Sequence, residues 1–402
     1  MLVQGIIARY KQRTALSFEG RIPALDGLRA FFVFSVVAFH LFEQSWLAPR
    51  FTVLGLHINL DPFLRTGYLW VDGMLLLSGF LLYLPYARSR EAGRPFLSRP
   101  GFYRRRLARI VPTYLLHLVI IFLVVALPER RYVTWWHAAR DWLAHLTFTH
   151  PLFPFSSRFT PLNGALWTIG VEMQFYLLFP LLARAFDRMP LFVYASGTAV
   201  ALAFRGYAMT IPQTPMLINQ LPAFLDVYLH GMIAAMVFAR FEKQKDDGLR
   251  RALFTAVTLA AVMGLAVIVR HQAGMRSIES LRVGQMSVRY AQSVLSALLL
   301  LGVSLGLGGI RLVMGNKVTA YLAAISYQVY MWHQMIAVQF KKWRIPPSEH
   351  PQPHTVFERD WQTLYVLLVM LATFVIATAI TYLVERPLLE RLSKPGQRKQ
   401  RR

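Results

Sequence analysis

The sequence predicts an all-α integral membrane protein with about ten transmembrane helices and both termini in the cytoplasm. The 402-residue chain is 55% hydrophobic and only 16% charged, whereas soluble domains carry closer to a quarter of charged residues. Long apolar runs recur along the whole chain, and short clusters of Lys and Arg separate them. Together these observations indicate a multi-pass protein of the cell membrane, meaning the cytoplasmic or inner membrane.

Ten segments approach the roughly 20 apolar residues that a membrane-spanning helix needs. Glu172 and Gln174 interrupt the fourth segment, and the eighth ends in a glycine-rich stretch. The ten segments are residues 25–44, 67–87, 110–127, 165–183, 191–209, 222–239, 253–270, 288–308, 318–338 and 363–384.

The basic residues set the expected orientation. If the loops alternate between the two sides of the membrane, 28 of the 44 Lys and Arg residues lie on the side of the termini and 15 on the other. The basic excess marks the cytoplasmic side. The formal net charge of +24 does not indicate a nucleic-acid partner, because the charges sit between apolar runs rather than on one water-filled face.

The expected domain organisation has three parts. Residues 1–24 form a polar and basic cytoplasmic segment, 25–385 form the transmembrane domain, and 386–402 form a basic cytoplasmic tail. The first apolar run is long enough to stay in the membrane, so no cleavable signal is expected. The chain has no cysteine, which excludes disulfides, thiolate metal sites and an acyl-cysteine intermediate.

The largest outer loop, 128–162, contains the sequence WWHAARDWLAHLTF. Its mixture of aromatic and charged residues predicts a helix that lies at the outer membrane interface. Two roles for this helix stay open: an aromatic belt that anchors the protein, and a contribution to substrate binding.

Ionisable groups inside membrane spans are costly and therefore point to function. Arg29 and His40 both lie in the first span. Eleven residues advance a helix by about 16 Å and turn it through three full turns plus about 20°, so both side chains face the same way, Arg29 near the cytoplasm and His40 toward the outside. The alternatives are that Arg29 snorkels to the inner interface and that a hydroxyl satisfies His40.

Further polar groups are predicted to reach the same depth as His40. Asp72 lies in the outer third of the second span, Glu172 two turns into the fourth, and Tyr330 and His333 in the ninth. Such a layer on four helices predicts a polar cavity. By contrast, His117 and His230 each occur singly in a span, and we expect packing or lipid-facing positions for them.

Six sequence patterns then match a known family in order, each on the expected span. They are LDGLRA with Arg-x10-His, GYLWVDGMLLLSGFLL, FYRRRLARIVPTY with Arg-x-x-Arg, ALWTIGVEMQFYLLFPLL, SYQVYMWH and VERPL. On these motifs the chain resembles the acyltransferase-3 family of membrane-bound O-acyltransferases over nearly its whole length. The resemblance implies that 25–385 is an acyltransferase domain.

The resemblance also implies a reaction. Members of the family take acyl groups, often acetyl, from cytoplasmic acyl-CoA and place them on sugars of envelope polysaccharides, on lipids or on secondary metabolites. The position of His40 is regarded as catalytic, and the positions of Arg29, Arg106 and Arg109 as essential. We expect acyl-CoA, in the simplest case acetyl-CoA, as a cosubstrate, a hydroxyl acceptor that carries a carbohydrate, no tightly bound cofactor and no metal.

Acyl transfer to an alcohol needs a base near neutrality and hydrogen-bond donors for the developing oxyanion. Histidine suits the first task, so His40 is expected to be the general base, with Glu172 or Asp72 orienting its ring. Tyr330 or His333 is expected to stabilise the oxyanion or to bind the acceptor.

Two expectations concern binding. Trp167 is placed with Tyr330 and His333 in the substrate-binding set. The basic run that contains Arg105, Arg106 and Arg109 is expected to hold the phosphates of coenzyme A. The alternative function is a transporter or flippase that uses the same polar cavity for an acylated or anionic small molecule.

Overall fold

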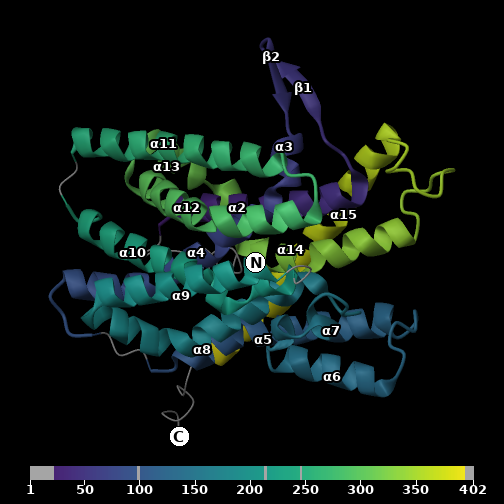
Figure 1. Cartoon of the computed structure of the whole chain (residues 1–402), viewed down its shortest axis with the longest axis horizontal. Coiled ribbons are helices and arrows are strands. Elements are labelled where there is room, and N and C mark those ends of the chain that lie inside the picture. Colours follow the sequence, from purple (N-terminus) through teal and green to yellow (C-terminus); the bar gives the residue numbers. More distant parts are fainter. Residues whose placement is uncertain (1–21, 97–99, 212–214, 245–246, 394–402) are drawn as a thin grey trace, which may run out of the picture.

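The computed structural model describes residues 22–96, 100–211, 215–244 and 247–393 and confirms the all-α fold (Figure 1). Most of the expected N-terminal segment 1–24, and residues 394–402 of the expected tail, lie outside the described residues. The described chain contains ten long helices, which are α2 (Ala24–Ser45), α4 (Val71–Glu91), α5 (Phe102–Ile121), α8 (Trp167–Arg188), α9 (Pro190–Thr210), α10 (Leu225–Phe241), α11 (Gly248–Ala273), α12 (Ile278–Leu305), α14 (Lys317–Lys342) and α15 (Arg359–Ile380).

Shorter elements connect or extend these helices. A two-stranded antiparallel hairpin follows α2 and pairs Arg50 with Asn59 and Val53 with Leu56. The short helices and strands are β1 (Arg50–Val53), β2 (Leu56–Asn59), α3 (Asp61–Arg65), α6 (Trp135–Leu146), α7 (Pro154–Ser157), α13 (Gly308–Met314) and α16 (Arg386–Ser393). The single-turn and π-helical pieces are η1 (Gly67–Trp70), η2 (Phe122–Ala126), η3 (His150–Leu152), η4 (Gly164–Leu166), η5 (Pro215–Asn219), η6 (Leu221–Phe224) and η7 (Thr381–Glu385).

The ten expected spans all correspond to long helices, and eight of these helices are long and apolar enough to cross a membrane by length and composition. The other two are α9 and α14. Both carry polar groups that lower their hydropathy but are buried, such as Arg205 on α9 and Gln328 and His333 on α14. Inward-facing polar groups are tolerated in a bundle because lipid never meets them.

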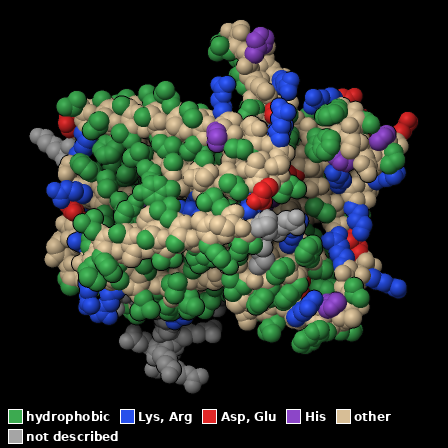
Figure 2. Space-filling model, viewed as in Figure 1, with side chains coloured by type: hydrophobic (Ala, Val, Ile, Leu, Met, Phe, Trp, Pro, Cys, Tyr) green, Lys and Arg blue, Asp and Glu red, His purple; other side chains and the backbone are tan. Residues whose placement is uncertain are grey.

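Each end of the described chain packs against a helix or turn of the bundle. Pro23, before α2, packs against Gly315, in the turn between α13 and α14. At the other end of the chain, α16 packs against α5. Figure 2 shows hydrophobic side chains spread over the helices, while many of the charged side chains gather toward the two ends and on the hairpin. This distribution is that of a protein with a lipid-facing belt.

Two glycines bring α4 and α10 into close contact. A Cβ atom on Gly79 would lie 2.4 Å from the backbone oxygen of Tyr228, and one on Gly231 would lie 2.1 Å from that of Leu76. Both distances are far below van der Waals contact, so only glycine permits this helix crossing. The close crossing holds the middle of α4, which carries Ser78, in a fixed position.

The outer loop forms the expected short helix, α6, which lies with α7 at one end of the molecule (Figure 1). Its Trp135 and Trp136 side chains are exposed, whereas Asp141 and His145 are buried on the opposite face. The exposed tryptophans lie outside the cavities described below, which favours the anchoring role over the substrate-binding one.

Candidate active site

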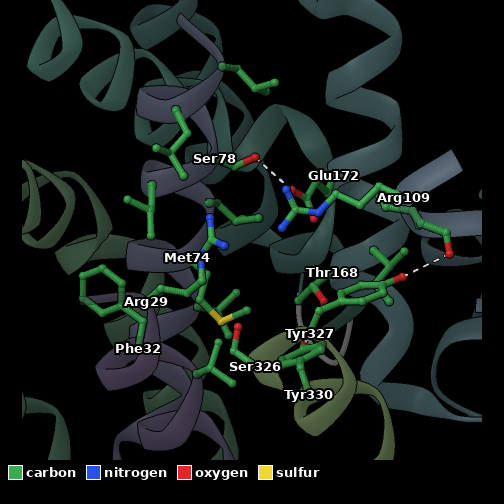
Figure 3. A pocket seen from close by; sticks show the side chains of 18 of the residues that line it. Arg29, Phe32, Met74, Ser78, Arg109, Thr168, Glu172, Ser326, Tyr327 and Tyr330 are labelled. Atoms are coloured by element: carbon green, nitrogen blue, oxygen red, sulfur yellow. Dashed lines mark hydrogen bonds between the residues drawn. The ribbon is translucent and has the colours of Figure 1, made fainter. Parts of the chain in front are cut away.

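A cavity of about 330 Å³ opens between α2, α4, α5, α8 and α14, at the centre of the bundle (Figure 3). One part of its wall is apolar and comes mainly from α2 and α4. The polar side chains come from all five helices and are Arg29, Ser78, Arg106, Arg109, Thr168, Glu172, Tyr176, Ser326, Tyr327 and Tyr330. A polar cavity is therefore present, but of the residues expected to form it only Glu172 and Tyr330 line it, whereas His40, Asp72 and His333 do not.

Glu172 is the only carboxylate among the described residues that line this cavity. Its Oε1 atom accepts a hydrogen bond of 2.8 Å from the hydroxyl of Ser78 and a second bond from the hydroxyl of Tyr176. Glu172 is thereby fixed on the wall of the cavity by α4 and by its own helix.

Two arginines supply positive charge to the cavity. Figure 3 shows Arg29 and Arg109 reaching into it from different helices, toward Ser78 and Glu172. In the part of the chain that the structure describes, neither guanidinium makes a hydrogen bond or an ion pair. The pair gives the cavity a cationic wall, and a guanidinium in a partly enclosed site is well suited to bind an anion.

The other arginines of the basic run differ in position. Arg106 lines the cavity, with its guanidinium carbon 5.6 Å from the centre of the Tyr176 ring and 5.8 Å from that of Phe102. Arg105 does not line it: its side chain is exposed and donates a 2.8 Å hydrogen bond to the backbone oxygen of Pro100. The structure therefore brings Arg29, Arg106 and Arg109 together and leaves Arg105 outside.

Tyr330 closes another part of the cavity wall. Its hydroxyl accepts a 2.9 Å hydrogen bond from Thr168 and donates one of 3.0 Å to the backbone oxygen of Ala165. The hydroxyl proton is thus already engaged, so Tyr330 must break a bond before it donates to an oxyanion. Trp167 lies next to Thr168 in sequence but does not line the cavity, because its ring packs against Phe224 at 5.9 Å.

His333 connects Tyr330 to His40. The ring centres of Tyr330 and His333 lie 5.7 Å apart, and those of His333 and His40 lie 5.2 Å apart. The Nδ1 atom of His333 lies 3.1 Å from the backbone oxygen of Val329. Since a carbonyl only accepts, Nδ1 carries the proton and Nε2 is a buried acceptor, without a partner among the described residues.

His40 lies beyond the cavity rather than in its wall. Its Nδ1 atom is 2.8 Å from Oε2 of Glu43, and its side chain is 19% exposed. A carboxylate at Nδ1 favours the tautomer with the proton on Nδ1, which leaves Nε2 free to accept a proton. Neither Glu172 nor Asp72, the carboxylates expected from the sequence, orients this ring. The His-x-x-Glu spacing of His40 and Glu43 is the sequence signal that would have identified the partner.

Asp72 belongs to a separate group of buried charges. Its Oδ2 atom lies 3.3 Å from Nε of Arg289 on α12, and both side chains are fully buried. Close by, Arg205 forms a bidentate pair with Asp226, with distances of 2.8 and 2.6 Å. Of the two partners that the sequence allows for Asp72, His40 or an arginine, the structure shows the arginine, because sequence depth alone does not fix the direction in which a side chain points.

The two remaining intramembrane histidines pack as expected. His117 accepts a 3.0 Å hydrogen bond from the side-chain amide of Asn163, and its ring lies 4.5 Å from that of Trp332. His230 is held between the hydroxyls of Ser293, at 2.7 Å, and Tyr194, at 3.0 Å. Neither lines the cavity.

Comparison with known proteins places the chain in a family. Residues 22–383 match the sequence profile of the family described as Acyltransferase domain. Acyltransferase MdmB of Streptomyces mycarofaciens is 26% identical over 93% of this chain and 93% of its own length. O-acetyltransferase OatA of Staphylococcus aureus is 30% identical over 40% of this chain, and the match covers only 24% of the length of OatA. No solved structure gives a significant match.

The family match covers all five helices of the cavity, together with His40 and Glu43. The chain therefore belongs to this acyltransferase family, as a multi-pass membrane member.

Proposed function

We propose that this protein is an O-acyltransferase of the cytoplasmic membrane that moves an acyl group, in the simplest case acetyl, from acyl-CoA to a hydroxyl of a sugar-containing acceptor. The observation that carries the proposal is the series formed by the arginine-lined cavity, Tyr330, His333 and His40. The cavity offers an anion site at one end of this series and a proton acceptor stands at the other.

The donor is assigned to the cavity because of its charge. Coenzyme A carries phosphates at one end and the thioester at the other, so it needs cations far from the reacting carbon. Arg29 and His40 lie on one helix, 11 residues apart, which separates them by about 16 Å along its axis. In this account Arg29, Arg106 and Arg109 hold the phosphates and the long arm extends past Tyr330 toward His40.

The tautomers of His40 and His333 determine the role of each histidine in the transfer step. Nε2 of His40 takes the proton of the acceptor hydroxyl as the oxygen attacks the thioester carbonyl. The carbon–sulfur bond then breaks, and the thiolate of coenzyme A takes up a proton from the imidazolium. Glu43 stabilises the imidazolium, as the acidic member of a catalytic triad does. Nε2 of His333, which is an acceptor, takes a hydrogen bond from a neighbouring hydroxyl of the acceptor and so orients the sugar rather than stabilising the oxyanion.

The test uses the purified protein in nanodiscs with acetyl-CoA labelled in the acetyl group and a panel of sugars. The proposal predicts equal amounts of free coenzyme A and of an alkali-labile acetyl ester on the sugar. Release of coenzyme A no faster than in protein-free discs would contradict it. In proteoliposomes, accumulation of intact labelled acetyl-CoA in the lumen would instead support the transporter alternative.

A further inference from the structure

A second cavity, of about 300 Å³, lies at the far end of α14. The loop between α14 and α15 builds it, at the same end of the molecule as α6 and α7 (Figure 1). We call it the outer pocket; its lining residues are Lys341, Arg344, Pro346, Ser348, His350, Pro351, Gln352, Pro353, His354 and Trp361. Its volume is at the lower end of the range for small-molecule sites.

The outer pocket is positively charged. Lys341 and Arg344 line it with two histidines, and no Asp or Glu occurs among its described lining residues. Ser348, which lines the pocket, donates a 2.7 Å hydrogen bond from its hydroxyl to the carboxylate of Glu358. The guanidinium of Arg344 is exposed and makes no hydrogen bond or ion pair within the described chain, whereas the neighbouring Lys342 is paired with Glu129 at 2.7 Å.

The walls of the pocket combine this charge with rigid rings. The indole nitrogen of Trp361 donates a 3.0 Å hydrogen bond to the backbone oxygen of Pro346. Beyond the lining residues, on the side of α2, the ring of the exposed Trp46 lies 5.2 Å from that of His354, centre to centre. The buried Nδ1 atom of His354 has no partner among the described residues. A cationic site with an indole ring in its wall and free polar atoms fits a polar ring that carries a negative charge.

The pocket is joined to the proposed catalytic histidine. Nζ of Lys341 donates a 2.8 Å hydrogen bond to the backbone oxygen of Gln44. Gln44 follows His40 by four residues on α2, so about one helical turn, roughly 6 Å, separates them along the helix axis. A sugar whose acidic group sits at Arg344 and Lys341 therefore lies within reach of His40.

We propose that the outer pocket binds the negatively charged group of an acidic sugar, a carboxylate or a phosphate, and thereby selects acidic sugars as acceptors. This inference rests on the proposed function and names the substrate class of the same reaction. Both side chains suit these groups. The guanidinium of arginine pairs with either anion in a bidentate manner, and the ammonium of lysine binds either one as a point charge.

The experiment compares acetyl transfer to glucuronic acid, to glucose 6-phosphate and to neutral glucose. We expect kcat/KM for at least one acid to exceed that for glucose by about tenfold, which is the effect of one charge-assisted hydrogen bond. The two acids separate a carboxylate site from a phosphate site. Equal kcat/KM values for all three sugars in the wild-type protein would overturn the inference.

The variants Arg344→Gln and Lys341→Gln should reduce the ratio of acidic to neutral acceptor, whereas a merely structural defect lowers both rates and leaves the ratio unchanged. Arg276→Gln is the matched control, because Arg276 is an exposed arginine of another outer loop, outside the pocket. A ratio that stays at the wild-type value in Arg344→Gln would overturn the inference.

Direct binding separates this inference from the proposed function. Glucuronic acid and glucose 6-phosphate are titrated onto the wild-type protein in nanodiscs of zwitterionic lipid, without any donor. Binding of one acid that weakens about tenfold in Arg344→Gln supports the pocket even if no acetyl transfer occurs, in which case only the transfer proposal fails. Absence of binding by both acids at millimolar concentration overturns the inference, whatever the transfer assay shows.

Discussion

The rings of His40 and His333 lie 5.2 Å apart, centre to centre, and are tilted by 38°. His333 is fully buried, whereas His40 is partly open and bound to Glu43. Both imidazoles carry the proton on Nδ1, by the bonds to Glu43 and to the Val329 backbone oxygen. The pair therefore offers one nitrogen, Nε2 of His40, that can deprotonate the attacking hydroxyl, and a second, Nε2 of His333, that can accept a hydrogen bond from a neighbouring hydroxyl of the acceptor.

His333→Gln should reduce kcat for acyl transfer by roughly tenfold to a hundredfold, less than the loss of the base itself, because His333 orients the acceptor and does not take its proton. KM for acyl-CoA should change little, because His333 lies outside the arginine-lined cavity. His230→Gln is the control, since that buried histidine is distant from the series of cavity and histidines. A large rise in the donor KM with unchanged kcat would contradict the role given to His333.

Glu43→Gln should lower kcat by roughly tenfold, because the amide keeps a hydrogen-bond acceptor near Nδ1 but loses the charge that stabilises the imidazolium. Glu43→Ala should be slower still. Steady-state rates at saturating donor measure both variants. The control Asp61→Asn removes a half-buried carboxylate that pairs with Arg65 in the next outer segment. Equal rates for Glu43→Ala and the wild type would show that the contact between His40 and Glu43 does not contribute to catalysis.

Arg29→Gln and Arg109→Gln should each raise KM for acetyl-CoA by about tenfold or more, the effect of losing a charge-assisted hydrogen bond to phosphate. Arg105→Gln should have a much smaller effect, because its side chain is outside the cavity. Acetyl-pantetheine, which lacks the nucleotide, separates phosphate binding from chemistry. The penalty in kcat/KM for the Arg109 variant should shrink with this donor, and an equal penalty with both donors would argue against a phosphate site.

Arg289→Gln should lower the free energy of unfolding by about 3–5 kcal/mol, because it leaves Asp72 buried without its partner. The double variant with Asp72→Asn should be more stable than the sum of the two single changes predicts. Thermal unfolding in detergent measures these differences. Activity per folded molecule should stay within about threefold of the wild type in Asp72→Asn. A loss on the scale of acid–base catalysis would instead show that Asp72 takes part in the reaction.

Acid should destabilise the outer end of the protein through His150. Burial, and then the stacked ring of His145, lower the pKa of His150 to about 3 from its ordinary value of 6.5. The unfolded chain therefore binds a proton that the folded protein excludes between these values. The contribution of His150 to the free energy of unfolding is fully present above pH 6.5. It is lost as the pH falls toward 3, by up to about 1.4 kcal/mol per pH unit.

Melting temperatures between pH 7.5 and pH 5 measure this effect. His150→Gln removes the titrating group, so its melting temperature should fall less steeply with pH than that of the wild type. Parallel curves for the two proteins would assign the acid sensitivity to other groups.

The sequence was sufficient to locate the helices because apolar runs of membrane length are unambiguous. Their ends were less predictable. The third span was expected from residue 110, but α5 begins at Phe102, since Arg104 to Arg109 continue the helix into the polar boundary. The structure thereby places Arg106 and Arg109 one turn apart on a rigid element, which explains why they share the cavity and Arg105 does not.

The site was predictable where one helix carries the information and not where two helices must meet. Arg29, Glu172 and Tyr330 were recognised as polar groups in spans, and all three line the cavity. The contact between Ser78 and Glu172 was not predictable, because it depends on how α4 and α8 are placed. The outer pocket was missed because its shape comes from a loop whose path no periodicity specifies.

The most direct test of the account is the rate of acetyl transfer from acetyl-CoA by His40→Ala, measured in nanodiscs and divided by the amount of folded protein. The account predicts a loss of at least about a hundredfold relative to the wild type, with the control His230→Gln retaining most of the activity. If His40→Ala transfers acetyl groups at the wild-type rate, His40 is not the base and the proposed mechanism is wrong.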